Sequence, residues 1–311
     1  MARLCPQPTA HLTSSRSHEV PDPMNLAQTK ALLSQFHIQP TRSLGQNFLV
    51  DERVVSRIGD LSELSPEDLV IEIGPGLGHL TIELARRAGQ VVAIEIDRHV
   101  LPALAHNLAS FDTVTLVHGD ALAQNLKLLC KDWDGPVKVV ANLPYYVTTD
   151  LMLKIMTELP FCQSLTLMMQ KEAAERIMAP VGSKGYSPVG IIAACIGTLR
   201  RVLSVGRGSY FPQPHVDSVV LQLEPHHEQL IAAQDLSGFG TFLQACFHQR
   251  RKTLYNNLNG FTMTGNRKIN PETWLNLIEN LPSDRNARAE SLTPAQFSKL
   301  YYSIIEFSKP I

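Results

Sequence analysis

The chain has 311 residues, 44% of them hydrophobic and 18% charged, which is typical of a globular protein with one sizeable core and material left for a smaller second domain. Its 28 basic and 29 acidic residues give a formal net charge of −1, and this balance excludes a polycation that coats nucleic acid without selection. No uninterrupted apolar run approaches the roughly 18 residues of a membrane span, and no apolar stretch near the start resembles a secretory signal. We therefore expect a cytoplasmic protein without membrane contact.

The five cysteines are scattered along the chain, with no CxxC pair and no histidine at ligand spacing. Free cysteines without such spacing usually pack as small hydrophobic side chains. We therefore expect buried thiols in a reducing compartment, and no metal site.

Residues 1–26 are rich in Pro, Ser and His without periodicity, so we expect a disordered tail, with Met24 as an alternative start. From about residue 66, β-branched runs alternate with helical patterns. Strands are expected at 69–73, 91–95, 113–117, 137–141 and 164–169. This alternation predicts an α/β fold with a doubly wound, Rossmann-like and mostly parallel sheet. Two later runs, 201–205 and 218–223, are joined by a loop too short for a crossover helix, so the last strand should be antiparallel.

After Pro225 the pattern becomes helical, so we expect a first domain at 27–225 and a small helical domain at 226–311. One helix is expected to carry these apolar residues near a single face: Leu243, Phe247, Leu254 and Leu258. The stretch 236–271 has no acidic residue, and it carries Arg250, Arg251, Lys252, Arg267 and Lys268. Such a cluster is typical of an RNA contact and equally of a solvated helix face, and its charge alone does not separate the two.

A glycine-rich turn follows the first predicted strand directly, in EIGPGLGHLT, with Gly74, Gly76 and Gly78. Glycines here let the backbone approach a ligand at the carboxyl edge of the sheet, beside a helix N-terminus. A dinucleotide cofactor prefers GxGxxG, which would need glycine in place of His79, and the observed GxGxG spacing suits a methyltransferase better. A tight strand-to-helix turn without a ligand would leave the same pattern.

Acidic residues end the next two strands. Glu95, in VVAIEID, lies about 20 residues after Gly74, the spacing at which a carboxylate accepts hydrogen bonds from both ribose hydroxyls of an adenosine-containing cofactor. Asp97 is the alternative acid, although strand alternation favours Glu95. Asp120, in HGDAL, is expected to accept the adenine amino group of the cofactor, and capping of the following helix is the other role that suits its position.

The segment ANLPYYV follows the fourth predicted strand and favours one chemistry. An exocyclic adenine amine is a poor nucleophile because its lone pair is conjugated into the ring. Acceptors for both of its N–H groups, here the Asn142 side-chain oxygen and the Leu143 carbonyl, would bias the nitrogen toward a tetrahedral geometry with an available lone pair. Pro144 would fix the turn, and Tyr145 would stack on the base. No strong general base is needed, because methyl transfer neutralises a sulfonium donor and the ammonium product gives up its proton afterwards.

Together these motifs resemble the ribosomal RNA small subunit methyltransferase A family, the adenine dimethyltransferases, over about residues 27–305. The resemblance is carried by SLGQNFLVD, VIEIGPGLG, AIEID, HGDAL, VANLPYYVTT, MMQKEAAERIM, YFPQPHVDSVV and HQRRKTLYNNL. It implies that these residues bind S-adenosylmethionine: Asn47, Leu49, Gly74, Gly76, Glu95, Asp120 and Asn142. It also implies that Tyr210 stacks on a flipped adenine opposite Tyr145, with Phe211 as the nearest competitor.

The resemblance further implies dimethylation of the adenine N6 amine in small-subunit (16S) ribosomal RNA, with a role in small-subunit maturation. The expected partner is the immature small subunit, contacted by Arg250, Arg251 and Lys252, and we expect a monomer. The chain departs from the family at Pro188, which stands in place of an arginine, and at Gly190, in place of a serine, so one RNA contact is not carried over. Asp150 replaces a common proline and is expected to be a helix N-cap.

Functions of other kinds fit parts of the same segments. A large-subunit ribosomal RNA methyltransferase of the resistance type would keep most of them. A glutamine amide methyltransferase uses a similar Asn-Pro-Pro-Tyr motif, but the GQNFL and VDS segments argue against it. A ribosome-assembly or transcription factor that has lost catalysis would be expected to degrade the segment from Asn142 to Tyr145, which is intact here.

Overall fold

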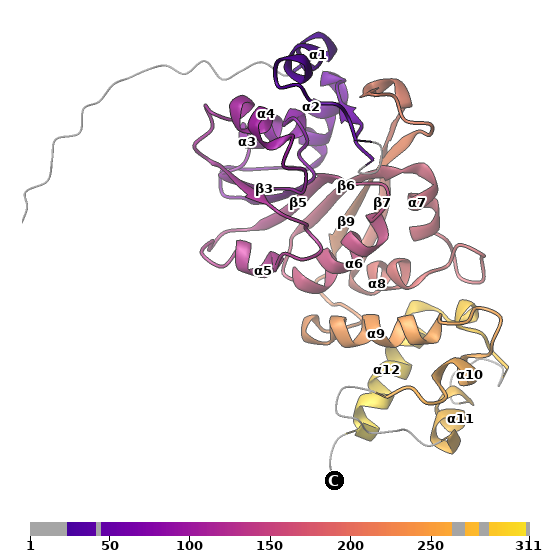
Figure 1. The fold of residues 1–311 in the computed structure, drawn as a ribbon. Helices are drawn as coiled ribbons and strands as arrows, with labels where there is room; N and C mark the ends of the chain where they lie inside the picture. Colours follow the sequence, from indigo (N-terminus) through magenta and orange to yellow (C-terminus); the bar gives the residue numbers. More distant parts are fainter. Residues whose placement is uncertain (1–23, 42–44, 263–270, 280–285, 309–311) are drawn as a thin grey trace, which may run out of the picture.

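The computed structural model describes residues 24–41, 45–262, 271–279 and 286–308, and residues 1–23 of the tail expected at 1–26 lie outside them. A seven-stranded sheet in the order β4-β3-β2-β5-β6-β9-β7 runs through the larger part of the chain, with helices on both faces (Figure 1). Its strands are β2 (Leu69–Ile73), β3 (Gln90–Glu95), β4 (Val114–His118), β5 (Val137–Asn142), β6 (Ser164–Gln170), β7 (Gly197–Val205) and β9 (Ser218–Pro225). The strands from β4 to β6 are parallel, whereas β9 is antiparallel to both β6 and β7. The predicted doubly wound fold with an antiparallel last strand is confirmed.

The helices of the described chain fall into two groups. Around the sheet lie α1 (Leu26–Gln35), α2 (Glu52–Leu61), α3 (His79–Ala85), α4 (Leu101–Asn107), α5 (Leu126–Leu129), α6 (Thr148–Glu158), α7 (Lys171–Ile177) and α8 (Pro188–Ile196). The C-terminal group comprises α9 (Leu236–Cys246), α10 (Leu254–Leu258), α11 (Pro271–Glu279) and α12 (Pro294–Ser308). None of these helices is long and apolar enough to cross a bilayer.

The central strands β2 and β5 are buried on both faces, which explains why they are almost continuously apolar. Val70 and Val140 pack with the side chains of α2 and α3 on one face, whereas Ile71 and Val139 pack with those of α6 and α8 on the other. This alternation follows from the two-residue period of a strand. The four cysteines within the described residues are free and buried, as expected, and Cys5 lies outside them.

Helix α1 begins at Leu26, within the range expected to be a disordered tail. Its N-cap is Asn25, whose side-chain oxygen accepts hydrogen bonds from the backbone N–H groups of Ala27 and Gln28. Gln28 reaches back to the Asn25 backbone and completes a capping box. Asn25 and Leu26, which were expected to belong to the disordered tail, are therefore part of an ordered helix and its cap.

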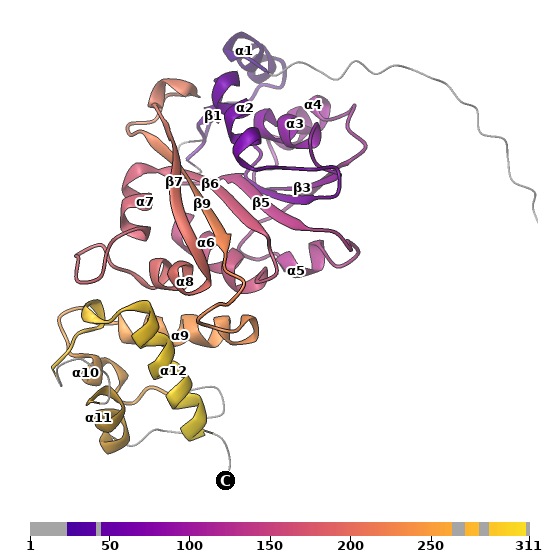
Figure 2. The same ribbon diagram turned by 180° about the vertical axis from the view of Figure 1, so that it is seen from behind.

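A small second sheet, absent from the sequence-based prediction, joins two distant loops. β1 (Phe48–Leu49) pairs antiparallel with β8 (Tyr210–Phe211), in the register Phe48 to Phe211 and Leu49 to Tyr210. The pairing fastens the segment after α1 to the loop between β7 and β9. Both loops thereby lie at one end of the main sheet (Figure 2).

The single helix expected over residues 243–258 is in fact two helices. α9 ends at Cys246, and α10 starts only after Thr253, whose hydroxyl accepts from the Asn256 backbone N–H. Between them Asn257 stabilises a turn, because its side chain donates to the carbonyls of Cys246 and Gln249. An asparagine that satisfies exposed carbonyls in this way competes with continued helix. The cationic residues 250–252 therefore lie on a turn, and Arg267 and Lys268 lie outside the described residues.

The departures at positions 188 and 190 have a structural reason. Pro188 is the first residue of α8, where a missing N–H costs nothing. A Cβ atom on Gly190 would lie 2.2 Å from the backbone carbonyl oxygen of Ile177, so α7 and α8 approach each other more closely than any larger residue permits. Asp150 is not an N-cap as expected: it lies in the first turn of α6, after Val147, where its charge still favours the helix dipole.

We expect Gly190→Ser to destabilise the protein by about 1–3 kcal/mol, since the added atoms must push two packed helices apart. Gly206→Ser is the matched control, because a Cβ atom there meets no atom within 4 Å. Urea unfolding midpoints of the two variants measure the difference. Equal midpoints would show that α7 and α8 tolerate the side chain.

Candidate functional site

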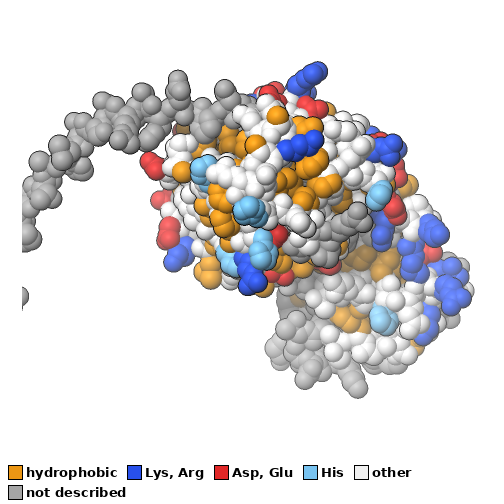
Figure 3. All heavy atoms as spheres, turned by 45° about the horizontal axis from the view of Figure 1, so that its top comes forward, with side chains coloured by type: hydrophobic (Ala, Val, Ile, Leu, Met, Phe, Trp, Pro, Cys, Tyr) orange, Lys and Arg blue, Asp and Glu red, His pale blue; other side chains and the backbone are white. Residues whose placement is uncertain are grey.

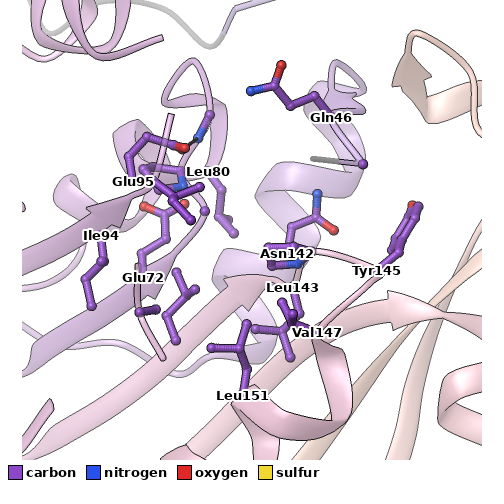
Figure 4. Close-up of a pocket in the computed structure, with 18 of the residues that line it drawn as sticks. Gln46, Glu72, Leu80, Ile94, Glu95, Asn142, Leu143, Tyr145, Val147 and Leu151 are labelled. Carbon is purple, nitrogen blue, oxygen red and sulfur yellow. Dashed lines mark hydrogen bonds between the residues drawn. The ribbon is translucent and has the colours of Figure 1, made fainter. Parts of the chain in front are cut away.

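A cavity opens at the carboxyl ends of the parallel strands and collects most of the predicted site residues (Figure 4). The predicted residues that line it are Asn47, Leu49, Gly74, Gly76, Glu95, Asp120, Asn142, Leu143, Pro144 and Tyr145. They lie in or next to β1, and at the carboxyl ends of β2, β3, β4 and β5 or in the loops that follow. Crevices at this edge are where open α/β sheets bind their ligands.

The glycine turn forms the floor of the cavity. Gly74, Gly76 and Gly78 have φ angles of 73°, 60° and 90°, a region that other residues rarely adopt. A Cβ atom on Gly76 would also lie 3.1 Å from the Phe48 ring, because β1 crosses over the turn. The turn therefore needs glycine for its backbone conformation and for its close packing.

Glu95 is held in place by backbone donors. Its Oε2 accepts from the Gly76 N–H at 3.0 Å and its Oε1 from the Asp97 N–H at 2.9 Å. Burial raises the pKa of the Glu95 carboxyl, and these two backbone bonds oppose that effect. Asp97, the alternative acid, instead accepts from the Gln46 side chain at 2.7 Å. Of the two acids, only Glu95 lines the cavity.

Asp120 is exposed at the rim of the cavity, after β4. Its Oδ1 accepts from the Leu122 N–H at 2.9 Å, and its backbone carbonyl accepts from the N–H groups of Ala123 and Gln124. This is a turn stabilised by Asp, whereas α5 is capped by Asn125. The other Asp120 carboxylate oxygen has no hydrogen bond within the described protein and is available to a ligand.

Asn142 ends β5 with its amide directed into the cavity, between the Glu95 side and the Tyr145 ring (Figure 4). Its Oδ1 is buried and accepts no hydrogen bond from the described residues. The neighbouring Leu143 N–H donates to the Met168 carbonyl at 2.9 Å, which anchors the start of the loop to β6. A buried acceptor without a donor is costly, so this atom points to a ligand that donates a hydrogen bond.

The two tyrosines of the expected aromatic pair occupy different places. Tyr145 lines the cavity, and its hydroxyl lies 3.2 Å from Ser218 Oγ. Tyr210 is only 4% exposed, is not among the lining residues, and donates to Met168 Sδ at 3.1 Å. Phe211 packs elsewhere, with Lys30 Nζ 5.1 Å from its ring centre. The expected sandwich of a base between Tyr145 and Tyr210 is therefore not preformed.

Two buried titratable residues of the cavity were not singled out from the sequence. Glu72 is 1% exposed and its Oε2 has no partner among the described residues. Burial, reinforced by the nearby Glu95 carboxylate, raises the pKa of Glu72 to about 8, although the neighbouring Thr81 side chain opposes the rise. The signal that could have identified Glu72 is a carboxylate inside an otherwise apolar strand.

His79, at the start of α3, also lines the cavity and bonds Thr29 of α1 at 2.8 Å. The Thr29 hydroxyl donates its proton to the Asn25 carbonyl, so His79 Nε2 must be the donor to Thr29. Burial lowers the pKa of His79 to about 4, which keeps the ring neutral. The contact spans 50 residues of sequence, so no local pattern indicates it.

The predicted RNA-binding residues lie apart from the cavity. Arg250, Arg251 and Lys252 are exposed on the turn between α9 and α10. Arg250 Nη2 lies 3.5 Å from the Ser183 carbonyl and 3.9 Å from a Glu290 carboxylate oxygen. Lysine and arginine side chains gather along one flank of the molecule in Figure 3. Within the described residues no group of three or more His, Cys, Asp or Glu side chains is arranged to hold a metal ion.

The fold and this cavity define an S-adenosylmethionine-dependent methyltransferase. A family model described as ribosomal RNA adenine dimethylase matches residues 38–298, and the chain belongs to this family. A protein of Staphylococcus haemolyticus named ribosomal RNA small subunit methyltransferase A is 39% identical over 279 residues, which are 88% of this chain and 93% of that protein. A protein of the same name from Staphylococcus epidermidis is 38% identical over 287 residues, covering 91% of this chain and 96% of that protein.

Two solved structures resemble the fold over most of the chain. The dimethyladenosine transferase from Plasmodium falciparum has a TM-score of 0.68 and 24% identity, and covers 84% of this chain and 98% of its own. The 23S rRNA methyltransferase ErmE has a TM-score of 0.57 and 26% identity, with coverage of 82% and 98%. Both structures therefore match more than four fifths of this chain.

The residues present fit the cofactor of this family. The left-handed glycine turn lets the backbone approach a ligand, and the backbone-anchored Glu95 carboxylate suits two ribose hydroxyls. Asp120 has a free carboxylate oxygen at the rim, and Asn142 Oδ1 has no donor among the described residues. Each of these polar atoms would gain a partner from an adenosine-containing ligand or from a base that enters beside it.

Proposed function

We propose that the chain transfers two methyl groups to the exocyclic N6 amine of adenines in small-subunit (16S) ribosomal RNA and thereby takes part in small-subunit maturation. The single observation that carries the chemistry is the buried Asn142 Oδ1, which lacks a donor from the described residues and lies beside the Tyr145 ring. The small subunit as target is supported by the names of the relatives that match most of the chain.

The cofactor-binding residues are assigned by their place in the cavity. Gly74 and Gly76 would lie under the cofactor, Glu95 would accept from its ribose hydroxyls, and Asp120 would accept from its adenine amine. Asn47 and Leu49 would cover it from β1, and Asn142 would lie at its reactive end. When bound, the cofactor supplies a methyl group activated by a sulfonium charge.

The residues around Asn142 would prepare the attacking nitrogen. Asn142 Oδ1 accepts one N–H of the adenine amine and the Leu143 carbonyl accepts the other, which draws the lone pair out of conjugation with the ring. Pro144 holds the turn, since it packs on Gly74 with its ring atoms 3.7 Å from the position of a Cβ. Tyr145 supplies an aromatic face for the base.

Tyr210, expected from the sequence to stack on the adenine, is proposed to act first through its contact with Tyr145. Its hydroxyl lies beside those of Tyr145 and Ser218, and burial raises the pKa of both tyrosines, so both stay neutral. Tyr210 would thereby help to hold the Tyr145 hydroxyl in place. It becomes a second stacking face for the adenine only when its own ring leaves the packing against Met168.

One labelling experiment tests the proposal. Purified protein and S-adenosylmethionine with a labelled methyl group are incubated with immature small subunits, with large subunits, or with protein substrates. We expect label in dimethylated adenine of small-subunit RNA. Label only in the large subunit would support the resistance-type activity, label only in glutamine would support a protein methyltransferase, and no label would support a non-catalytic factor. Each of these three results contradicts the proposal.

The same proposal assigns Arg250, Arg251 and Lys252 to the RNA backbone. It also includes an immature small subunit as partner, a monomeric enzyme and a cytoplasmic location.

We expect joint replacement of these three residues by Ala to weaken RNA binding and to flatten its dependence on salt, by about one unit of slope for each phosphate that the variant no longer neutralises. Replacing the exposed Lys127 and Lys131, in and after α5, is the control. Filter binding over a salt series measures both, and an unchanged slope for the triple variant would remove these residues from the RNA interface.

A further inference from the structure

A short stretch of chain crosses the mouth of the cavity and touches both of its ends. We call Gly45–Leu49 the crossing segment. A Cβ atom on Gly45 would lie 3.9 Å from the Tyr145 backbone nitrogen, and the Phe48 ring lies on Gly76. Leu49 is paired with Tyr210 in the small sheet. The crossing segment thus joins the side proposed for the base to the side proposed for the cofactor.

The Gln46 side chain fastens this segment to the cofactor side. In Figure 4 it extends from the Tyr145 side across the mouth, toward the side that holds Glu95. Its Nε2 donates to Asp97 Oδ2 at 2.7 Å, and its Oε1 accepts from the Thr41 N–H at 2.8 Å. Both ends of the amide are therefore used, which fixes the direction of the donor.

The surroundings of Asp97 leave one of its carboxylate oxygens available for the Gln46 amide. Asp97 is buried, its Oδ1 accepts from the His99 N–H at 2.9 Å, and its own N–H donates to Glu95 Oε1. Asp97 Oδ2 is left for Gln46 alone among the described residues. A hydrogen bond from an amide to a buried carboxylate is among the stronger ones in proteins. Through Asp97, Gln46 is connected to the carboxylate proposed to hold the ribose.

We propose that the bond between Gln46 and Asp97 is a clasp that positions the crossing segment over the cofactor and sets the rate at which cofactor and its demethylated product leave. The proposal rests on the placement of the cofactor under the crossing segment given above. Neither residue touches the reacting atoms, so both are positioning residues. Dimethylation of one adenine uses two cofactor molecules, so the clasp must open between the two transfers.

Exchange of the donor and acceptor roles provides a sharp test. In Gln46→Glu, two carboxylates face each other, and in Asp97→Asn, two amide N–H groups face each other, because the His99 N–H still requires the oxygen at position 97. In the double variant, the carboxylate introduced at position 46 would accept from both the Thr41 N–H and the new amide, so the bond is restored with its direction reversed. We expect each single variant to release bound S-adenosylhomocysteine about tenfold faster or more, and the double variant to return to within about threefold of the wild type.

The readout is the dissociation rate of S-adenosylhomocysteine in stopped-flow displacement, with single-turnover methylation at saturating cofactor measured in parallel. The KM for cofactor should rise in the single variants while the single-turnover rate stays within about twofold. Gln163→Glu and Asp134→Asn make the same chemical changes at exposed positions near the opposite edge of the sheet, and should leave release unchanged. The proposed role of this bond would be wrong if the single variants released S-adenosylhomocysteine at the wild-type rate, or if the double variant released it as fast as the single variants. A wild-type protein that fails to bind the cofactor would instead overturn the proposed function.

Discussion

Replacing Asn142 by Ala is expected to lower the rate of methyl transfer by about a hundred- to a thousandfold, the range found when one preorganised hydrogen-bonding group is removed from a transition state. The oxygen at this position is already buried and without a donor from the described residues, so its desolvation occurs on folding and its bond forms only with a bound amine. Binding of cofactor and of RNA should change little, because most of their proposed contacts lie elsewhere.

The measurement is the single-turnover rate with small-subunit RNA, together with cofactor affinity by calorimetry. Asn142→Asp is the informative companion, since it keeps an oxygen acceptor at the same place and should retain more activity than Asn142→Ala. If the alanine variant transfers methyl groups at the wild-type rate while its fold is intact, Asn142 does not prepare the nucleophile.

Replacing Glu72 by Gln is expected to stabilise the ligand-free protein at pH 8 and to have little effect near pH 5. The pKa of this carboxyl is about 8 in the folded protein against 4.5 for a free side chain, mainly because of burial. Between these two pH values the unfolded chain has released the proton and the folded chain retains it, so the wild-type stability falls as pH rises. The total is on the order of a few kcal/mol, and Gln keeps the shape without this penalty.

Urea unfolding of both proteins at pH values from 5 to 8 measures the effect. The difference between the variant and the wild type should grow steadily across this interval. Glu67→Gln, at an exposed position before β2, removes a carboxyl without burial and should show no such growth. Parallel curves for Glu72→Gln and the wild type would mean that Glu72 is ionised in the fold.

The sheet could be predicted from the sequence because its strands carry their own signal. A buried parallel strand is a run of β-branched residues, and LVIEI at 69–73 coincides with β2. The small sheet escaped prediction, since two-residue strands such as Phe48–Leu49 have no periodicity and pair with a segment more than a hundred residues away. The helix over 243–258 was wrong because its apolar spacing continues across a turn that Asn257 stabilises.

The site, too, contains residues that could be predicted from the sequence and contacts that could not. Gly74, Glu95, Asp120 and Asn142 follow strands whose ends must meet at one edge, so their convergence in the cavity was predictable from strand order. The partners of these residues were not, because they depend on packing. Asp97 bonds Gln46 and does not line the cavity, and Tyr210 is buried and bonds Met168 Sδ. Such choices are decided by side chains distant in sequence.

The C-terminal helices share one continuous apolar core with the sheet. Ile192 of α8, Phe239 of α9 and Phe297 of α12 belong to the same buried cluster as the strands, and the Tyr186 hydroxyl donates to the Leu292 carbonyl at 2.9 Å. The cationic turn at 250–252 is flanked by Cys246 and Leu254, which belong to this same cluster, so packed side chains connect the turn to the sheet that carries Asn142. If residues 250–252 bind an RNA phosphate as proposed, the spacing between this turn and Asn142 would determine which nucleotides can reach the cavity.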